Sequence, residues 1–242
     1  MKRISDPDQL AEAGLVPAEK LEALHRVASR WAVSITPAMQ ARIDPADPAD
    51  PIARQLVPSV AELAIASDER EDPIGDAAYS PVKGITHRYP DRVLLKPTHT
   101  CAVYCRFCFR REAVGPGGES LSPAELDAAL AYISRDERIW EVILSGGDPL
   151  ILSPRRLGEI VRRLDAIGHL GVIRVHTRVP AAEPERVDAE LVAALRANKA
   201  VWIVLHANHA RELDEPTRAA VARLVDAGLP VLAQTVLLAG VG

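Results

Sequence analysis

The sequence predicts an α/β fold, in which a parallel sheet alternates with helices after a small helical region. Three observations indicate this class. Short apolar runs recur after about residue 90, helix-start signals separate them, and apolar side chains before residue 80 follow a helical spacing. A chain of 242 residues, 48% of them hydrophobic, can bury one substantial core.

The N-terminal third is expected to be helical, because Leu21, Leu24 and Val27 recur at helical spacing. Three prolines interrupt this pattern within Asp44–Pro51, where they remove backbone donors and keep the preceding residues out of the helical conformation. We therefore assign residues 1–83 to a helical N-terminal region and linker.

Residues 84–242 are expected to form the core of the fold. The predicted strands are Val93–Lys96, Glu141–Ser145, Val172–Thr177, Val201–His206 and Val231–Val236. Between them, Ser122 and Glu125 have the spacing of a capping box. Ser153 and Asp214 each stand before an early proline and begin two further helices. The sequence ends after the fifth strand, so we expect an open, C-terminally truncated core.

Composition excludes several classes of protein. The net charge of −4 and the scattered arginines show no nucleic-acid footprint. Without a secretion signal or a run of about 18 apolar residues, we expect a cytoplasmic protein that does not enter a membrane. All three cysteines fall within eight residues, which suits metal ligands better than a secreted disulfide framework.

The central motif is Cys101-Ala-Val-Tyr-Cys105-Arg-Phe-Cys108, a CX3CX2C arrangement after the first predicted strand. Three thiolates can hold three irons of a [4Fe-4S] cube, which leaves the fourth iron free to bind a small molecule. The alternatives are a structural zinc site that adds His99, and a loop without metal. Zinc sites usually present two separated ligand pairs, which three cysteines in one tight loop fit poorly.

Six motifs stand in order within residues 30–242: Gly84–Arg92, Cys101–Arg111, Leu144–Leu150, Ile173–Pro180, Leu205–His209 and Gln234–Gly240. With these motifs the chain resembles the lysine 2,3-aminomutase family of radical S-adenosylmethionine (SAM) proteins. The resemblance implies a radical SAM partial (β/α)6-type barrel, here incomplete after the fifth strand. It also implies a [4Fe-4S] cluster, SAM and pyridoxal 5′-phosphate (PLP), in an isomerase that converts L-lysine to β-lysine by 2,3-amino migration.

The same resemblance implies site residues and partners. The positions that match the family's SAM pocket are Ser145, Gly146, Gly147, Asp148, His206 and Gln234. Adjacent glycines let the backbone approach a ligand closely. From the residues alone, His206 and Gln234 would be satisfied polar side chains beside the core. The implied partners are an amino acid substrate and a reduced flavodoxin or ferredoxin as electron donor, and a homo-oligomer stays open.

Three arginines near the cysteines have further implied roles. Arg110 matches the arginine that holds the substrate carboxylate, a task suited to a planar bidentate donor. Arg88 and Arg92 match positions associated with PLP and its phosphate. Phe107 stands where some family members have histidine, so the cluster environment is expected to differ between branches.

The family's PLP-binding lysine lies beyond the position that corresponds to Gly242, and Lys96 on the first strand is not expected to replace it. A Schiff-base lysine exchanges PLP with substrate, so we expect an impaired aminomutase cycle with cluster and SAM binding retained. Two alternatives stay open. One is a non-catalytic cluster- and SAM-binding fragment or partner module, and the other is a radical SAM aminomutase for another amino acid such as glutamate.

Overall fold

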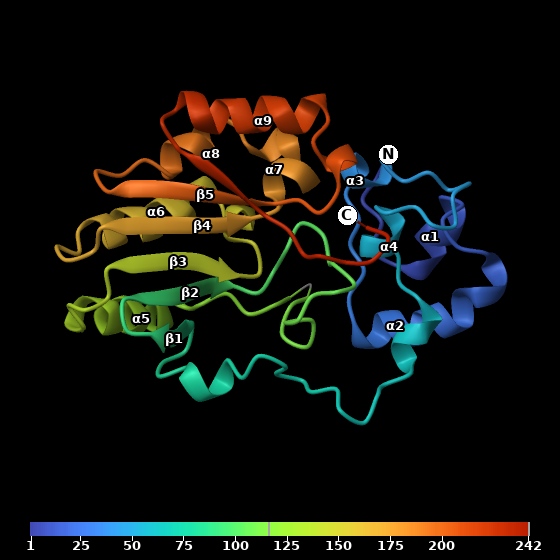
Figure 1. Cartoon of the computed structure of the whole chain (residues 1–242), viewed down its shortest axis with the longest axis horizontal. Helices are drawn as coiled ribbons and strands as arrows, with labels where there is room; N and C mark the ends of the chain where they lie inside the picture. Colours follow the sequence, from blue (N-terminus) through green and yellow to red (C-terminus); the bar gives the residue numbers. More distant parts are fainter. Residues whose placement is uncertain (116, 242) are drawn as a thin grey trace.

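The computed structural model describes residues 1–115 and 117–241, so Gly242, the end of the predicted core, lies outside the described residues. The sheet has six strands in the order β1-β2-β3-β4-β5-β6 (Figure 1). Their bounds are β1 Ile85–Tyr89, β2 Arg92–Thr98, β3 Glu141–Gly146, β4 Val172–Thr177, β5 Ala200–His206 and β6 Val231–Gln234. The pair β1 and β2 is antiparallel, and every later pair is parallel. The predicted α/β class and its five parallel strands are confirmed, although β6 ends at Gln234 rather than at Val236.

Strand β1 was not among the predicted strands. Its first two residues, Ile85 and Thr86, are buried, whereas its last two are exposed. The strand therefore shows no alternation of apolar and polar side chains that would mark it in the sequence. It forms a hairpin with β2 and lies at the edge of the sheet, where one strand neighbour is enough.

The helices alternate with the parallel strands as expected. Their bounds are α1 Pro7–Glu12, α2 Leu21–Arg30, α3 Pro37–Gln40, α4 Ala53–Leu56, α5 Pro123–Arg135, α6 Pro154–Asp165, α7 Val179–Ala182, α8 Ala189–Ala194 and α9 Glu215–Asp226. Short 3-10 segments are η1 Ala18–Lys20, η2 Val60–Leu63, η3 Ala77–Tyr79, η4 Pro149–Ile151, η5 Pro184–Arg186 and η6 Ala210–Glu212. The predicted helix starts are confirmed: Ser122 and Glu125 form the capping box of α5. Ser153 caps α6 and Asp214 caps α9 through backbone N–H groups.

The two faces of the sheet differ in character. Successive strand residues point to opposite faces. The face toward α5, α6, α8 and α9 carries the buried residues Val93, Leu95, Val142, Leu144, Ile173, Val175, Val201 and Ile203 (Figure 1). The other, open face carries the alternate residues, which include polar and charged side chains such as Lys96, Ser145 and His206. This second face is the interior of a partial barrel, and it ends at the carboxyl edge of the parallel strands.

The N-terminal helices lie at that carboxyl edge. The arrows of β3 and β4 point toward the end of the molecule that holds α1 to α4 (Figure 1). Leu10, Ile35 and Met39 are fully buried and belong to the same hydrophobic cluster as the strands. The chain after β6 returns to this end, where Arg54 donates to the backbone oxygen of Gly240 at 3.3 Å. Segments from both ends of the sequence thus frame the carboxyl edge.

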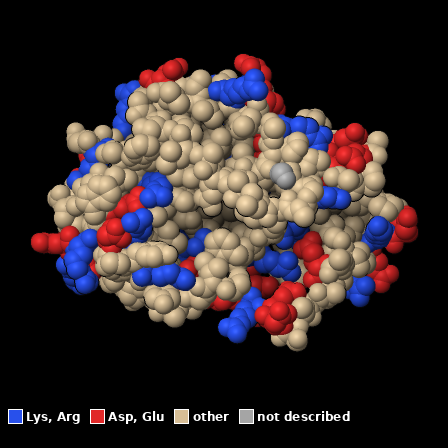
Figure 2. All heavy atoms as spheres, viewed as in Figure 1, with Lys and Arg blue, Asp and Glu red and all other residues tan. Residues whose placement is uncertain are grey.

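Charged side chains of both signs are interspersed on the face shown in Figure 2, which is hollowed near its centre. This distribution agrees with the scattered arginines of the sequence and shows no single-sign patch on that face. Within residues 1–115 and 117–241, none of the helices has the length and apolar character needed to cross a membrane.

Candidate functional site

The three cysteines lie on one long loop between β2 and α5. The loop is pinched at its base, where His99 N donates to Glu119 O at 3.1 Å and Leu121 N donates to Pro97 O at 3.0 Å. Between these contacts the cysteines lie in irregular backbone directly after β2. This cysteine loop, described over residues 99–115 and 117–120, therefore starts at the carboxyl edge of the sheet.

The N-terminal region holds the other side of the cysteine loop. Arg106 donates two hydrogen bonds to the Glu62 carboxylate, at 2.7 and 3.1 Å, and a third to Ala32 O at 2.8 Å. Its side chain is 9% exposed. Tyr104 N donates to Ser34 O at 3.2 Å. These contacts fix the backbone on both sides of Cys105, so the sulfur positions depend on residues before 63.

All three cysteine thiols are free, and together they line a cavity of about 50 Å³. Burial raises the pKa of Cys101 well above its usual value, and nearby Asp148 and the other two sulfurs raise it further. Burial likewise raises the pKa of Cys108, with a contribution from Cys105. Buried thiols prefer the neutral form unless a positive metal centre takes the place of the protons. The donor set therefore fits an iron-sulfur cluster, which binds thiolates.

The described residues hold no preformed tetrahedral site of the kind that the zinc alternative requires. A tetrahedral zinc holds its ligand sulfurs at about 2.3 Å and so gathers them tightly around one point. Across the described residues, no three His, Cys, Asp or Glu side chains come together in this way. A four-iron cube is different, because each thiolate binds a separate iron and the sulfurs stand farther apart.

The double glycine after β3 packs directly against the base of the cysteine loop. A Cβ on Gly146, whose φ is +101°, would lie 2.7 Å from Thr98 O, and one on Gly147 would lie 2.4 Å from Thr100 O. In return, Gly147 N donates to Thr98 O at 2.8 Å. Both positions therefore require glycine because two backbone segments meet there. The predicted contact of this turn with SAM stays a prediction.

Asp148 ties three segments together. Its carboxylate accepts hydrogen bonds from Thr177 Oγ1 at 2.7 Å, from Arg178 N at 2.7 Å and from Leu150 N at 3.0 Å. Burial raises the pKa of Asp148, while these hydrogen bonds act in the opposite direction. Since its oxygens are used within the fold, we propose that Asp148 shapes the SAM turn rather than contacting the ligand through its side chain.

Four polar side chains share the open face at the carboxyl edge. His206 pairs with Gln234 across β5 and β6, so the two predicted SAM residues lie side by side. Leu144 pairs with Val175 on the covered face, which places the next residues, Ser145 and His176, together on the open face. The structure thus brings the predicted residues of three strands onto one surface, with His176 between them.

His176 was absent from the predicted site, although in Val172–Thr177 it is the polar side chain nearest the carboxyl end of the open face. Its Nε2 is buried and has no hydrogen-bond partner among the described residues. Burial, reinforced by the Arg174 cation and opposed by the neighbouring Gln234 side chain, lowers the pKa of His176 to about 4. Burial also lowers the pKa of His206 to about 4, with Arg178 as the second cause. Both rings are neutral at pH 7 and can accept or donate a hydrogen bond to a ligand.

The low pKa of His176 predicts a pH-dependent stability. The unfolded chain binds a proton at this residue near pH 6.5, whereas the folded chain does so near pH 4. The unfolding free energy that depends on a neutral His176 is fully present above pH 6.5 and is lost as the pH falls toward 4. For the iron-free chain, we expect His176→Gln to reduce the loss of unfolding free energy between pH 7 and pH 5 by about 2 kcal/mol. Urea unfolding at the two pH values measures this difference.

His25→Gln is the matched control, because His25 lies exposed on α2. This variant should keep the wild-type difference between pH 7 and pH 5. If His176→Gln shows the wild-type difference as well, the buried imidazole does not cause the pH dependence.

The three predicted arginines contact different acids. Arg110 donates twice to Asp76 Oδ2, at 2.9 and 3.1 Å, and Arg88 lies 3.6 Å from Asp76 Oδ1. Arg92 pairs with Tyr89 in the β1–β2 hairpin, so its backbone lies near that of Arg88, but its guanidinium contacts other acids than Asp76. Its partners are Asp91 and Glu141. Arg88 and Arg110 therefore share the Asp76 carboxylate, which Arg92 does not contact.

Lys96 points from β2 to the open face beside the double glycine. A Cβ on Gly146 would lie 2.9 Å from Lys96 Cβ. Burial lowers the pKa of Lys96, an effect that nearby Asp76 opposes and Arg110 reinforces. The lysine thus lies beside the predicted SAM turn, close enough to Asp76 and Arg110 for their charges to affect it.

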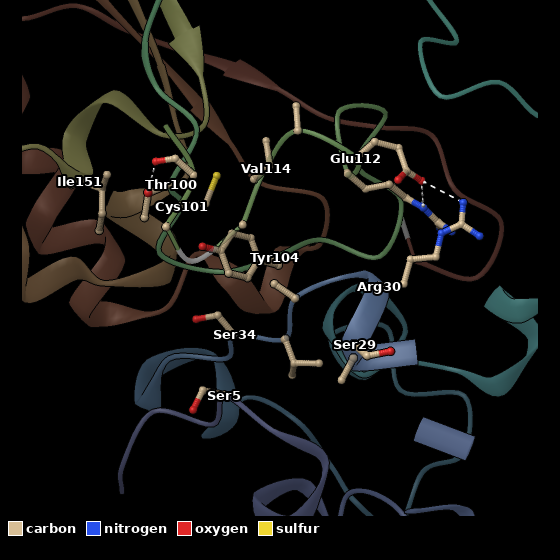
Figure 3. Close-up of a pocket in the computed structure, with 18 of the residues that line it drawn as sticks. Ser5, Ser29, Arg30, Ser34, Thr100, Cys101, Tyr104, Glu112, Val114 and Ile151 are labelled. Atoms are coloured by element: carbon tan, nitrogen blue, oxygen red, sulfur yellow. Dashed lines mark hydrogen bonds and ion pairs between the residues drawn. The ribbon is translucent and has the colours of Figure 1, made fainter. Parts of the chain in front are cut away.

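A larger cavity, of about 780 Å³, is lined by both the cysteine loop and residues of the N-terminal region. Figure 3 shows Cys101 and Tyr104 on the side of the loop and Ser29 and Ser34 on the opposite side. The predicted SAM residues are not among the described residues that line it. The cavity therefore gives a second approach to Cys101, distinct from the open face of the sheet.

A partial βα barrel with three free cysteines on the loop after its first parallel strand defines the radical SAM class of proteins. Residues 95–241 match the family model described as Radical SAM superfamily, and the chain belongs to this superfamily and, within it, to the 2,3-aminomutases. The predicted family is thereby confirmed.

The chain is similar to relatives named as lysine 2,3-aminomutases and to one named as a glutamate 2,3-aminomutase. L-lysine 2,3-aminomutase of Acetoanaerobium sticklandii is 40% identical over 239 residues, which are 99% of this chain and 58% of that protein. The enzyme of the same name from Escherichia coli is 35% identical over 238 residues, 97% of this chain and 69% of that protein. Glutamate 2,3-aminomutase of Clostridioides difficile is 34% identical over 241 residues, 99% and 56% respectively. The chain thus spans about 58% of the first relative's length.

Proposed function

We propose that Cys101, Cys105 and Cys108 hold a [4Fe-4S] cluster and that the chain binds SAM across the carboxyl edge of its sheet. The observation that carries this proposal is the common cavity of the three free thiols, next to the double-glycine turn after β3. The cluster, when bound with SAM and reduced by one electron, supplies a 5′-deoxyadenosyl radical. We propose reduced flavodoxin or ferredoxin as the donor of that electron.

The chain's own residues bind and orient SAM in this proposal. The rigid backbone of Gly146 and Gly147 offers main-chain groups beside the cysteine loop. His206 and Gln234 lie side by side on the open face, where neutral imidazole and amide groups can bind the ligand's polar atoms. His176, with a buried nitrogen that lacks a partner among the described residues, extends the same surface.

For the whole reaction, we propose 2,3-amino migration on L-lysine, with Arg110 binding the substrate carboxylate. The planar guanidinium already makes a double contact with one carboxylate oxygen, that of Asp76, so it is oriented for such a partner. Substrate has to displace Asp76 from Arg110. We propose that Arg88, at the same acid, and Arg92 take part in PLP binding, and of the two the position of Arg88 agrees better with a shared site.

Glutamate is the second candidate substrate, and the 34% identity to a glutamate 2,3-aminomutase over 99% of this chain favours it. A third candidate is a cluster- and SAM-binding module that does not complete the migration. The three readings share the cluster and differ in the amino acid product.

Anaerobic reconstitution of the full chain should give about four irons per chain, and dithionite with SAM should then release 5′-deoxyadenosine. With PLP present, incubation with L-lysine should yield β-lysine, detected by mass spectrometry. β-Glutamate from glutamate would favour the second substrate, and deoxyadenosine without any β-amino acid would favour the module. A chain that stays colourless and iron-free contradicts the proposed function altogether.

A further inference from the structure

A buried arginine contacts one of the three cysteines directly. Arg178 follows β4 and is held by its backbone N–H to Asp148. Its Nη1 donates to Cys105 Sγ at 2.8 Å, and its side chain is only 6% exposed. The two residues are 73 positions apart in the sequence, so the fold and not the local chain brings them together.

A buried acid balances the charge of this arginine. Arg178 Nη2 donates to Glu212 Oε2 at 2.9 Å, and the Glu212 side chain has no exposed surface. Burial raises the pKa of Glu212, but Arg178 and the backbone N–H of Asn208 outweigh it, so the pKa lies below its usual value. Gln55 Nε2 donates to the same carboxylate at 3.1 Å. The ionised pair is therefore fully enclosed by hydrogen-bonding groups.

Stability alone does not account for this arrangement. A buried ion pair contributes little net stability, because the loss of hydration offsets the attraction between the charges. Within the described residues, Arg178 Nε has no hydrogen-bond partner, whereas Nη1 is directed at a sulfur. The guanidinium is thus placed for the thiolate of Cys105 rather than for the best pairing with Glu212.

A cation that donates a hydrogen bond to a ligand sulfur withdraws electron density from the cluster. It stabilises the reduced cluster more than the oxidised one, because the reduced cluster carries one more negative charge. Glu212 has the opposite effect, but its carboxylate contacts Nη2, whereas Nη1 contacts the sulfur directly. The net effect of the pair on the cluster is therefore that of a positive charge.

We propose that Arg178 is a positioning residue for the cluster, which orients the Cys105 thiolate and raises the cluster's reduction potential, while Glu212 limits the rise. This inference rests on the proposed function, because it requires a cluster bound to Cys105. The same network reaches the SAM surface, since Asn208, whose Nδ2 donates to Gln55, also contacts His206 Nε2 at 3.0 Å through Oδ1. Arg178 and Glu212 thus connect the cluster ligand to a predicted SAM residue.

The test is a redox titration of the reconstituted full chain, followed by the electron paramagnetic resonance signal of the reduced cluster, without SAM turnover. Glu212→Gln keeps the shape of the side chain and leaves Arg178 unbalanced, so the potential should shift to a more positive value. The double variant Arg178→Gln with Glu212→Gln removes both charges together, so the potential should shift to a more negative value. These opposite signs are not expected from a general disturbance of packing.

Arg42→Gln is the matched control. Arg42 is also buried and ion-paired, with Asp214 at 2.7 Å, but its contacts include no cysteine. This variant should keep the wild-type potential. If the double variant fails to assemble a cluster, Arg178→Lys replaces it. Lysine keeps the positive charge but lacks the planar guanidinium with two terminal nitrogens. The reduction potential should therefore shift to a more negative value by a smaller amount.

A wild-type chain without a cluster would refute the proposed function. The role of Arg178 alone is tested by the potentials of the variants that do hold a cluster. Variants with full iron content and the wild-type potential, or with shifts of the same sign for both variants, overturn the inference. Opposed shifts together with an unchanged Arg42→Gln support it.

Discussion

Replacing any one of the three cysteines by serine should leave the reconstituted chain with less than one iron instead of about four. Release of 5′-deoxyadenosine should fall at least roughly 100-fold, because removing a direct ligand affects the cluster at least as strongly as removing its supporting contacts. Iron analysis and quantification of 5′-deoxyadenosine measure the two effects. The chain has only three cysteines, so no other thiol can substitute.

Val103→Ala is the control for a general disturbance of the cysteine loop. Val103 lies between two of the ligands and is 3% exposed, so its truncation removes buried apolar volume but no sulfur. This variant should melt at a lower temperature and still take up about four irons. Full iron content in the serine variants would show that these thiols do not hold the cluster.

The second large effect is expected at the double glycine. Gly147→Ala places a methyl group 2.4 Å from Thr100 O and 2.7 Å from the backbone carbon of His99, and neither backbone atom can move without moving the cysteine loop. We expect a loss of about 2–3 kcal/mol in the free energy of unfolding. Reconstituted iron should fall along with stability, because Cys101 directly follows Thr100. Chemical denaturation and iron analysis of the same preparation test both expectations.

Gly168→Ala provides the matched control, since Gly168 is exposed and a Cβ there would meet no atom within 4 Å. This substitution should leave stability and iron content at wild-type values. Wild-type behaviour of Gly147→Ala would show that the turn and the loop do not need their close approach.

The parallel strands and most of their helices could be predicted because their signals are local. Buried parallel strands read as short apolar runs, and capping boxes and early prolines mark helix starts within four residues. Strand β1 escaped prediction for the opposite reason: it lies at an edge and presents mixed side chains to solvent. The cluster prediction, like that of the parallel strands, needed only a local signal, the spacing of the three cysteines.

The surroundings of the cysteines could not be predicted, because they depend on long-range packing. Arg178 contacts Cys105, 73 residues away in the sequence, and Gln55, 123 residues away, and no sequence pattern predicts either contact. Asp148 stays a predicted SAM-pocket residue, and the sequence did not predict that its carboxylate connects β3 to the end of β4. Arg88 and Arg110 meet at Asp76, which lies in residues 1–83, the predicted helical N-terminal region and linker.

The contacts of Arg106 with Glu62 and Ala32 have a thermodynamic consequence for assembly. They join the backbone of the three predicted cluster ligands to residues made early in synthesis, so we expect iron uptake and the docking of the first sixty or so residues to be linked equilibria. This linkage is reciprocal. A metal bound to the thiols should protect the amino-terminal helices from local opening. A substitution that loosens those helices should weaken metal binding by the same free energy. Early residues far from the sulfur ligands in sequence thereby act as determinants of cofactor affinity.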